Sequence, residues 1–150
     1  MKGFRRLHLF VLFSLLLCNF TLFSQTQDFL DISAKTKQSY LDRGYKLVDY
    51  ASDSIIDISP LVSSNIDLDF KTYYIVHVQI DACVFCEYDL YFVDNENNMY
   101  ELNPEFIVEN NLKQAVYRFN NNENSSGKYV VILKSELPYF ANIFVFKKKF

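Results

Sequence analysis

The sequence has no tryptophan, and its 150 residues include only three glycines, three prolines, two methionines and two histidines. Disordered chains are rich in glycine and proline and poor in large apolar side chains. This chain instead carries 15 phenylalanines and 11 tyrosines. The composition therefore excludes a disordered chain and predicts one well-packed globular domain.

Basic residues are also few, with 15 lysines and arginines against 18 aspartates and glutamates. Three of the basic residues, Lys2, Arg5 and Arg6, lie at the N-terminus. Without residues 1–24 the chain would keep 12 basic and all 18 acidic residues, which gives a net charge of −6. A cationic surface for nucleic acid is therefore not expected.

Residues 1–24 have the features of a signal peptide. The basic residues are followed by an apolar run over residues 7–18, which is shorter than the ~20 residues that a membrane-spanning helix needs. Polar residues follow from Ser24, where we predict cleavage, so the protein is expected to be exported, periplasmic or extracellular. Leu22 is larger than the small residue usual at the third position before a cleavage site, and a retained anchor is the alternative.

A short helix is predicted over residues 28–43. Four residues with helical spacing form its modest apolar face: Phe29, Ile32, Thr36 and Tyr40. Gly44 follows and can adopt the left-handed conformation that often ends a helix. We assign residues 25–52 to a helical lead-in and residues 53–150 to a β domain.

Residues 45–50 and 54–58 form short stretches rich in β-branched or aromatic side chains, and strand patterns dominate from residue 66 onward. In the strand that begins near residue 73, alternate residues form a face that we assign to the core: Tyr74, Val76, Val78 and Ile80. Further strands are expected at 88–93, 99–102, 115–119, 128–133 and 142–148. The links between them are rich in asparagine and aspartate, and no long helical spacers occur. The predicted fold class is mainly β: an antiparallel β-sandwich, jelly-roll-like, preceded by one short N-terminal helix.

Two motifs resemble those of a known family. The residues from Tyr74 to Asp94 follow the order Y-x-V-x-V-x-x-D-x-C-x-x-C-x-x-D-L-x-x-x-D, and residues 126–133 read SGKYVVIL. Together they resemble the secreted pre-peptidase C-terminal β-sandwich, in the stand-alone bacterial version that carries a cysteine pair. The resemblance covers residues 40–146 and implies the fold but no particular activity. Glu87 replaces the family's frequent aspartate, and Asn97 or Asn98 stands where its hairpin glycine is common.

Cys83 and Cys86 are the only cysteines beyond the predicted signal peptide, and an oxidising compartment favours a disulfide between them. A redox site normally places the first thiolate at a helix N-terminus. Here Glu87-Tyr88-Asp89 follows, which is acidic and strand-forming, so we predict a structural disulfide. Zinc is disfavoured because two thiolates need two further ligands and His77 is the only histidine beyond the predicted signal peptide.

Four acidic residues lie close together in sequence near the ends of two predicted strands: Asp81, Glu87, Asp89 and Asp94. Oxygen-rich clusters can bind calcium, although this spacing does not match an EF-hand loop. A solvated acidic rim is the alternative. His77 lies on the other face of the strand that begins near residue 73, where a surface or partly buried histidine is expected. It has no evident catalytic partner in the sequence, so no catalytic residue is assigned. A platform for sugar or protein could come from tyrosines expected at the surface: Tyr73, Tyr91, Tyr100, Tyr117 and Tyr139.

The expected function is that of an exported non-enzymatic module that binds an unidentified protein or glycan of the cell envelope. Neither a cofactor nor a membrane span after cleavage is expected. Two alternatives remain. One is a thiol-disulfide redox protein that uses Cys83 and Cys86, and the other is a calcium-stabilised adhesion module.

Overall fold

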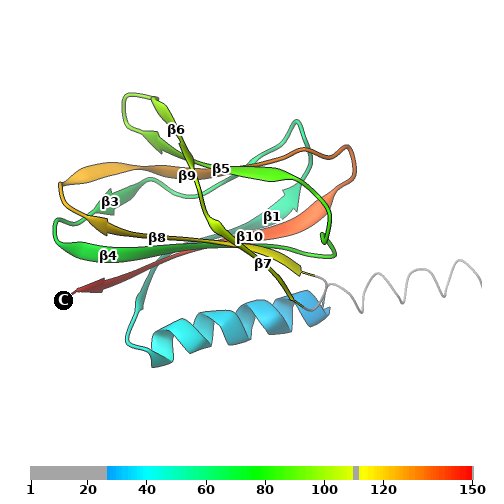
Figure 1. Cartoon of the computed structure of the whole chain (residues 1–150), viewed down its shortest axis with the longest axis horizontal. Coiled ribbons are helices and arrows are strands. Elements are labelled where there is room, and N and C mark those ends of the chain that lie inside the picture. Colours follow the sequence, from blue (N-terminus) through cyan, green and yellow to red (C-terminus); the bar gives the residue numbers. More distant parts are fainter. Residues whose placement is uncertain (1–26, 110–111, 150) are drawn as a thin grey trace, which may run out of the picture.

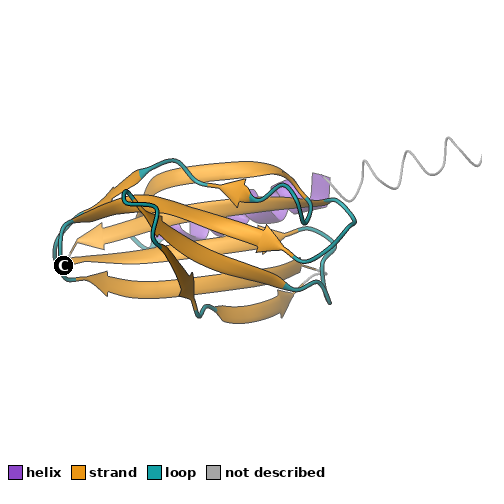
Figure 2. Ribbon diagram, turned by 90° about the horizontal axis from the view of Figure 1, so that it is seen from above, coloured by secondary structure: helices purple, strands orange, loops and turns teal. Residues whose placement is uncertain are grey.

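The computed structural model describes residues 27–109 and 112–149 (Figure 1). The predicted signal peptide, residues 1–24, lies outside the described residues. A helix over residues 27–42 is followed by strands that form two antiparallel sheets, as Figure 2 shows from above. The predicted fold class is confirmed. In the part of the chain that the structure describes, no helix combines the length and apolarity needed to cross a membrane.

The first sheet has five strands, which from edge to edge are β1 (Lys46–Ile55), β10 (Tyr139–Lys149), β4 (Thr72–Ile80), β8 (Leu112–Asn121) and β7 (Glu105–Glu109). Across the second sheet, the order of the strands is β2 (Leu61–Val62), β9 (Ser125–Leu133), β5 (Tyr88–Asp94) and β6 (Met99–Leu102). In addition, β3 (Ile66–Leu68) pairs with β9. Every recorded pairing between these strands is antiparallel.

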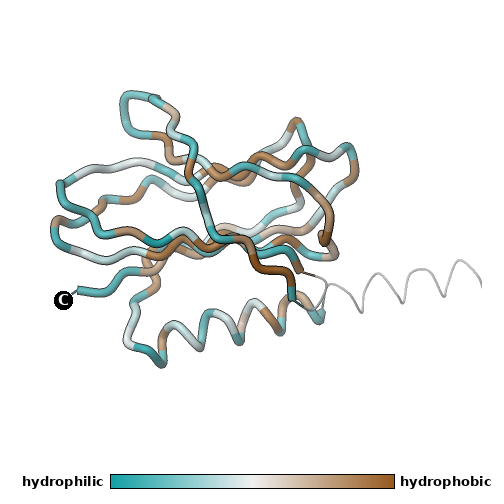
Figure 3. The backbone as a smooth tube through the Cα atoms, in the orientation of Figure 1, coloured by the Kyte–Doolittle hydropathy of each residue, from teal (hydrophilic) through white to brown (hydrophobic). Residues whose placement is uncertain are grey.

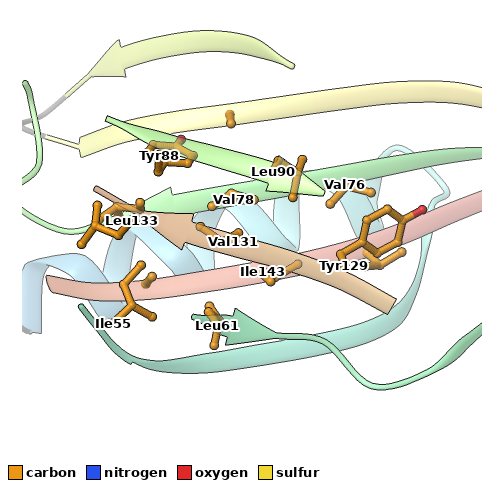
Figure 4. Packing of buried hydrophobic residues seen from close by; sticks show 14 of the residues in the cluster. Ile55, Leu61, Val76, Val78, Tyr88, Leu90, Tyr129, Val131, Leu133 and Ile143 are labelled. Carbon is orange, nitrogen blue, oxygen red and sulfur yellow. The ribbon is translucent and has the colours of Figure 1, made fainter. Parts of the chain in front are cut away.

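The main core lies between the two sheets (Figure 4). The face of β4 that the alternation assigned to the core is buried there, because Tyr74, Val76, Val78 and Ile80 are inaccessible to solvent. From the facing sheet, Leu90 of β5 and Val131 of β9 pack against them. The period-2 pattern of the sequence therefore gave the orientation of this strand correctly.

Strand β1 runs across the boundary that the sequence placed at residue 53. It pairs with β10 from Lys46 to Ile55, with an irregularity between Leu47 and Asp49. Such a bulge interrupts the alternation of inward and outward side chains. Residues 46–52 therefore belong to the first sheet, although their sequence lacks a regular strand pattern.

Turn predictions are confirmed at two positions. Gly44 ends the N-terminal helix with φ of +82°, and Asn97 takes φ of +65° in the β5–β6 hairpin. Asp94 stabilises that hairpin by accepting hydrogen bonds from the backbone N–H groups of Glu96 and Asn98, each 2.9 Å long. These bonds give partners to backbone N–H groups of the turn that are not paired between the two strands.

The N-terminal helix covers the outer face of the first sheet (Figure 1). Tyr40 packs there with apolar residues of β4, β8 and β10: Ile75, Val116, Phe144 and Phe146. Near the start of the helix, Phe29 is buried against the ring of Phe140. The molecule therefore has three layers, and the helix gains the tertiary support that its modest apolar face requires.

Candidate functional site

The cysteine pair lies in the loop between β4 and β5. The Cys83 and Cys86 sulfurs are at disulfide distance, and their Cα atoms are 5.4 Å apart. Cys83 is buried in the main core, and Cys86 packs against its edge. The chain continues into strand β5 rather than into a helix. A buried first cysteine without a following helix lacks the exposure and the helix N-terminus that redox-active cysteines normally have.

Phe85 stands between the two cysteines and is 94% exposed. Two other large apolar side chains are also mostly exposed, Ile58 in the β1–β2 loop at 86% and Leu137 in the β9–β10 loop at 65%. Among the described residues these three have the largest exposures of any large apolar side chain. We call the three loops, residues 56–60, 81–87 and 134–138, the loop end.

Backbone hydrogen bonds tie these loops to one another. The Asp57 N–H donates to Ser135 O at 3.0 Å, which joins the first loop to the third. The Lys134 N–H donates to Glu87 O at 2.8 Å, which joins the third loop to the second. An open hollow of about 600 Å³ lies between the second and third loops, with Phe85 and Tyr139 in its lining. The three exposed apolar side chains, Phe85, Ile58 and Leu137, which we call the apolar tips, are therefore held on loops that are hydrogen-bonded to one another.

The surroundings of these tips are acidic. Asp57, Glu87 and Glu136 are exposed on the three loops. Lys134 is already paired with Asp89 at 2.9 Å, and this hydrogen-bonded contact raises the pKa of the lysine. The loop end thus combines protruding apolar side chains with negative charge around them.

The structure does not bring the four residues of the calcium hypothesis together. Asp81 and Glu87 flank the cysteine loop and Asp89 is paired with Lys134, whereas Asp94 lies at the other end of β5. At 3.3 Å per residue, Tyr88 and Asp94 are about 20 Å apart. The described residues contain no group of three or more His, Cys, Asp or Glu side chains arranged to hold a metal.

His77 lies on the outer face of β4, beneath the N-terminal helix, and only 6% of it is exposed. Its Nε2 is 2.8 Å from Gln114 Oε1 and its Nδ1 is 3.1 Å from the Tyr40 hydroxyl. Because an amide oxygen only accepts, the neutral ring donates from Nε2 and accepts from Tyr40 at Nδ1. Burial lowers the pKa of His77 to about 4. Among the described residues, the polar contacts of the ring are to Gln114 and Tyr40 and to no carboxylate.

The amide groups beside His77 extend this contact into a buried polar network. Gln79 Nε2 donates to Gln114 Oε1 at 3.1 Å and to Thr36 Oγ1 at 3.0 Å, while the Ser33 hydroxyl donates to Gln79 Oε1 at 2.9 Å. Asn142 Nδ2 then donates to Ser33 Oγ at 2.7 Å. The network connects the helix to β4, β8 and β10 and fixes its position on the sheet.

The tyrosines expected to form one platform are distributed over several places. Tyr100 and Tyr117 line a cleft of about 180 Å³ between the sheets, together with Phe92, Phe119 and Tyr129. The cleft lies beside the part of β8 beyond Val116, where β7 no longer pairs. Tyr139 lines the hollow at the loop end instead. Tyr73 packs against Tyr45, and Tyr91 donates to Asp89, so neither joins the cleft.

Comparison with known proteins adds one distant likeness. No family model and no curated protein matches the chain, so the pre-peptidase C-terminal resemblance stays a prediction. Among solved structures the chain is similar to the CBM22-1 and GH10 modules of endo-1,4-β-D-xylanase 10B from Clostridium thermocellum, complexed with xylohexaose. The TM-score is 0.39 at 10% identity, and the match covers 69% of this chain but 25% of that chain.

Sequence reasoning missed the loop end as a unit. Phe85 was visible as an apolar residue between two cysteines, but Ile58 and Leu137 are 27 and 52 residues away from it in sequence. They come together only because β1, β4 and β10 are neighbours in the first sheet and because β5 and β9 are neighbours in the second. The indication available in the sequence was an apolar residue within a turn-forming segment, which predicts an exposed apolar side chain.

Proposed function

We propose that this chain is an exported, non-enzymatic binding module that engages a protein of the cell envelope through its loop end. The observation that carries the proposal is the convergence of Phe85, Ile58 and Leu137 on one end of the sandwich. Burying a side chain of this size against a partner releases about 1.5–3 kcal/mol. Three such tips in a connected framework supply a core for an interface.

The charge around the tips indicates which partner fits. With Asp57, Glu87 and Glu136 exposed on the loops, a complementary surface has apolar pockets and basic residues around them. An anionic membrane surface would be repelled by the same carboxylates. A protein partner with a basic rim is therefore favoured over a lipid surface.

Export is supported by the leader sequence and by the cysteine pair, since disulfides persist in oxidising compartments. In this proposal the bond has a mechanical role. It closes the turn that carries Phe85, so the side chain loses less conformational freedom when a partner binds. The burial of Cys83 supports this role over thiol exchange, which needs an accessible sulfur.

Site-specific photo-crosslinking tests the proposal. The full chain is expressed in cells that export it, with a photoreactive amino acid in place of Phe85. We expect one envelope protein to be crosslinked and the yield to fall at least about tenfold when Ile58→Ser and Leu137→Ser are added, because the two tips share the interface. The matched control is Phe70, which is 49% exposed in the β3–β4 turn. Equal adducts from positions 85 and 70, or none from 85, would refute the proposal.

A glycan partner is the second candidate, and the aromatic cleft favours it. Aromatic rings such as Tyr100 and Tyr117 offer flat faces against which a sugar ring can pack, and the cleft is open to solvent beside them. The same crosslinking method, with the photoreactive amino acid also placed at position 100, separates the two candidates. A saccharide adduct from position 100, with no protein adduct from position 85, would favour the glycan.

A further inference from the structure

Strand β7 is the exposed edge of the first sheet. It pairs with β8 on one side, and no described strand pairs with its other side. All five of its residues are exposed, including the apolar sequence Phe106-Ile107-Val108 at its centre, which Figure 3 shows in brown. Their exposures are 49%, 36% and 55%. Such an edge offers unpaired backbone N–H and C=O groups together with apolar side chains.

Nothing else in the described fold covers this edge. The N-terminal helix makes its contacts with β4, β8 and β10, which lie on the inner side of β7. Natural sheets usually block a free edge with a lysine, a proline or a bulge in the middle of the strand. Here the centre of β7 carries none of these, so the edge is open to another strand.

We propose that β7 pairs with β7 of a second copy of this chain, in antiparallel orientation, so that the first sheets of two molecules form one continuous sheet. The order of residues in β7 is self-complementary about Ile107. With Ile107 on the two-fold axis, Phe106 lies opposite Val108 of the second copy and Ile107 lies opposite its own equivalent. Aromatic and β-branched residues in directly opposite positions are favourable cross-strand pairs.

The charges at the two ends of β7 can be accommodated in this arrangement. In the same register Glu105 lies opposite Glu109 of the second copy, and two carboxylates alone would repel. Arg118 offsets part of that repulsion, because its Nη1 is 2.8 Å from Glu105 Oε2 and its side chain is 41% exposed. Glu105 pairs with Val116 in the ladder, so Arg118 lies two residues further along the same face. By symmetry each end of the paired strands carries two carboxylates and one guanidinium, which is bound to Glu105.

The pairing uses none of the loop-end side chains, because Phe85, Ile58 and Leu137 are on loops outside β7. The inference is therefore independent of the proposed function. A dimer formed by one short strand buries a small area, so we expect reversible association rather than a permanent complex.

Cysteine crosslinking tests both the pairing and its register. Single cysteines are introduced into the exported full chain, in a Cys18→Ser background so that only the Cys83–Cys86 pair remains. Directly opposite residues of an antiparallel pair have Cα atoms about 4.5 or 5.5 Å apart, within the disulfide range of about 4.4–6.8 Å. We expect Ile107→Cys to form a disulfide-linked dimer by itself. Phe106→Cys and Val108→Cys should crosslink efficiently only when the two variants are mixed.

Sedimentation equilibrium without crosslinks gives a second readout. Ile107→Lys places two ammonium groups opposite each other and should weaken the dimer at least about tenfold. The matched control is Val62→Lys, since Val62 is 40% exposed on β2, an edge strand of the other sheet. Circular dichroism confirms that each variant is folded.

Four results would overturn the inference. The first is a monomer at every concentration together with no Ile107→Cys dimer. The second is self-crosslinking of Phe106→Cys that exceeds that of Ile107→Cys, which would refute the register. The third is a dimer weakened equally by Ile107→Lys and Val62→Lys, which would place the contact elsewhere. Crosslinking of Ile107→Cys to a different protein, with no homodimer, would also refute self-pairing.

Discussion

At the scale of single residues, His77 makes the stability of this protein depend on pH. Burial lowers the pKa of His77 to about 4 in the folded chain, whereas an unfolded chain has the ordinary value of 6.5. Below pH 6.5 the unfolded state therefore binds more protons than the folded state. The contribution of the buried, neutral His77 to the free energy of unfolding is complete above pH 6.5, decreases as the pH falls, and is fully lost below about pH 4. The full contribution is roughly 3 kcal/mol.

The variant His77→Gln removes this titration and keeps a hydrogen-bonding side chain next to Gln114 and Tyr40. We expect urea unfolding to show a weaker loss of stability between pH 6.5 and 4 in the variant than in the native protein. Other groups, including Arg118 and Asp81, are common to both proteins, so the difference isolates His77. Parallel stability curves for the two proteins would contradict the assignment.

The sequence placed His77 correctly on the face of β4 that points away from the main core. It did not predict complete burial, because a surface or partly buried strand histidine was expected there. Alternation reports which face a side chain occupies but not what covers that face. The covering element is the helix, and its contact depends on Ser33 and Thr36 reaching Gln79 across more than 40 residues of sequence.

At the scale of elements, Ser33 holds the N-terminal helix on the first sheet. Its hydroxyl donates to Gln79 Oε1 and accepts from Asn142 Nδ2, and all three residues are buried. Ser33→Ala leaves two buried amide groups with one partner fewer each, which costs about 1–3 kcal/mol. We expect a lower thermal midpoint, measured by circular dichroism. Ala34→Ser, on the exposed side of the same helix, is the control and should change stability little.

Most strands were predictable because their sequences alternate, but β7 was not. All five residues of β7 are exposed, so no inward and outward pattern exists to be detected, and Pro104 precedes it as a turn indication. β1 was only partly recognised because its bulge breaks the pattern. β6 is also an edge strand with mostly exposed residues, yet it was predicted over the residues observed, Met99–Leu102, because it follows the turn signals of residues 94–98. An edge strand without such a signal, or a strand with an irregularity, is determined by its neighbours rather than by its own period.

At the scale of the whole molecule, the sequence indicated a sandwich but not which ends of strands meet. The cysteine turn was predicted as a local feature, and its disulfide distance agrees with that prediction. The loop end depends on strand order, in which β10 lies between β1 and β4. Pairings over such long sequence separations leave no local pattern, so the convergence of Phe85 with Ile58 and Leu137 could be obtained only from the fold.

The position of β10 also makes folding of the domain depend on a late segment of the chain. β10 pairs with β1 and β4 and buries four large side chains on its two faces: Ile143, Phe144, Val145 and Phe146. At about 1.5–3 kcal/mol each, their loss rivals the 5–15 kcal/mol that stabilises a typical domain. A chain that stops after residue 138 should therefore be unfolded by circular dichroism, whereas one that stops after residue 148 should keep a cooperative thermal transition. A cooperative transition in the shorter chain would show that the second sheet is stable without this strand.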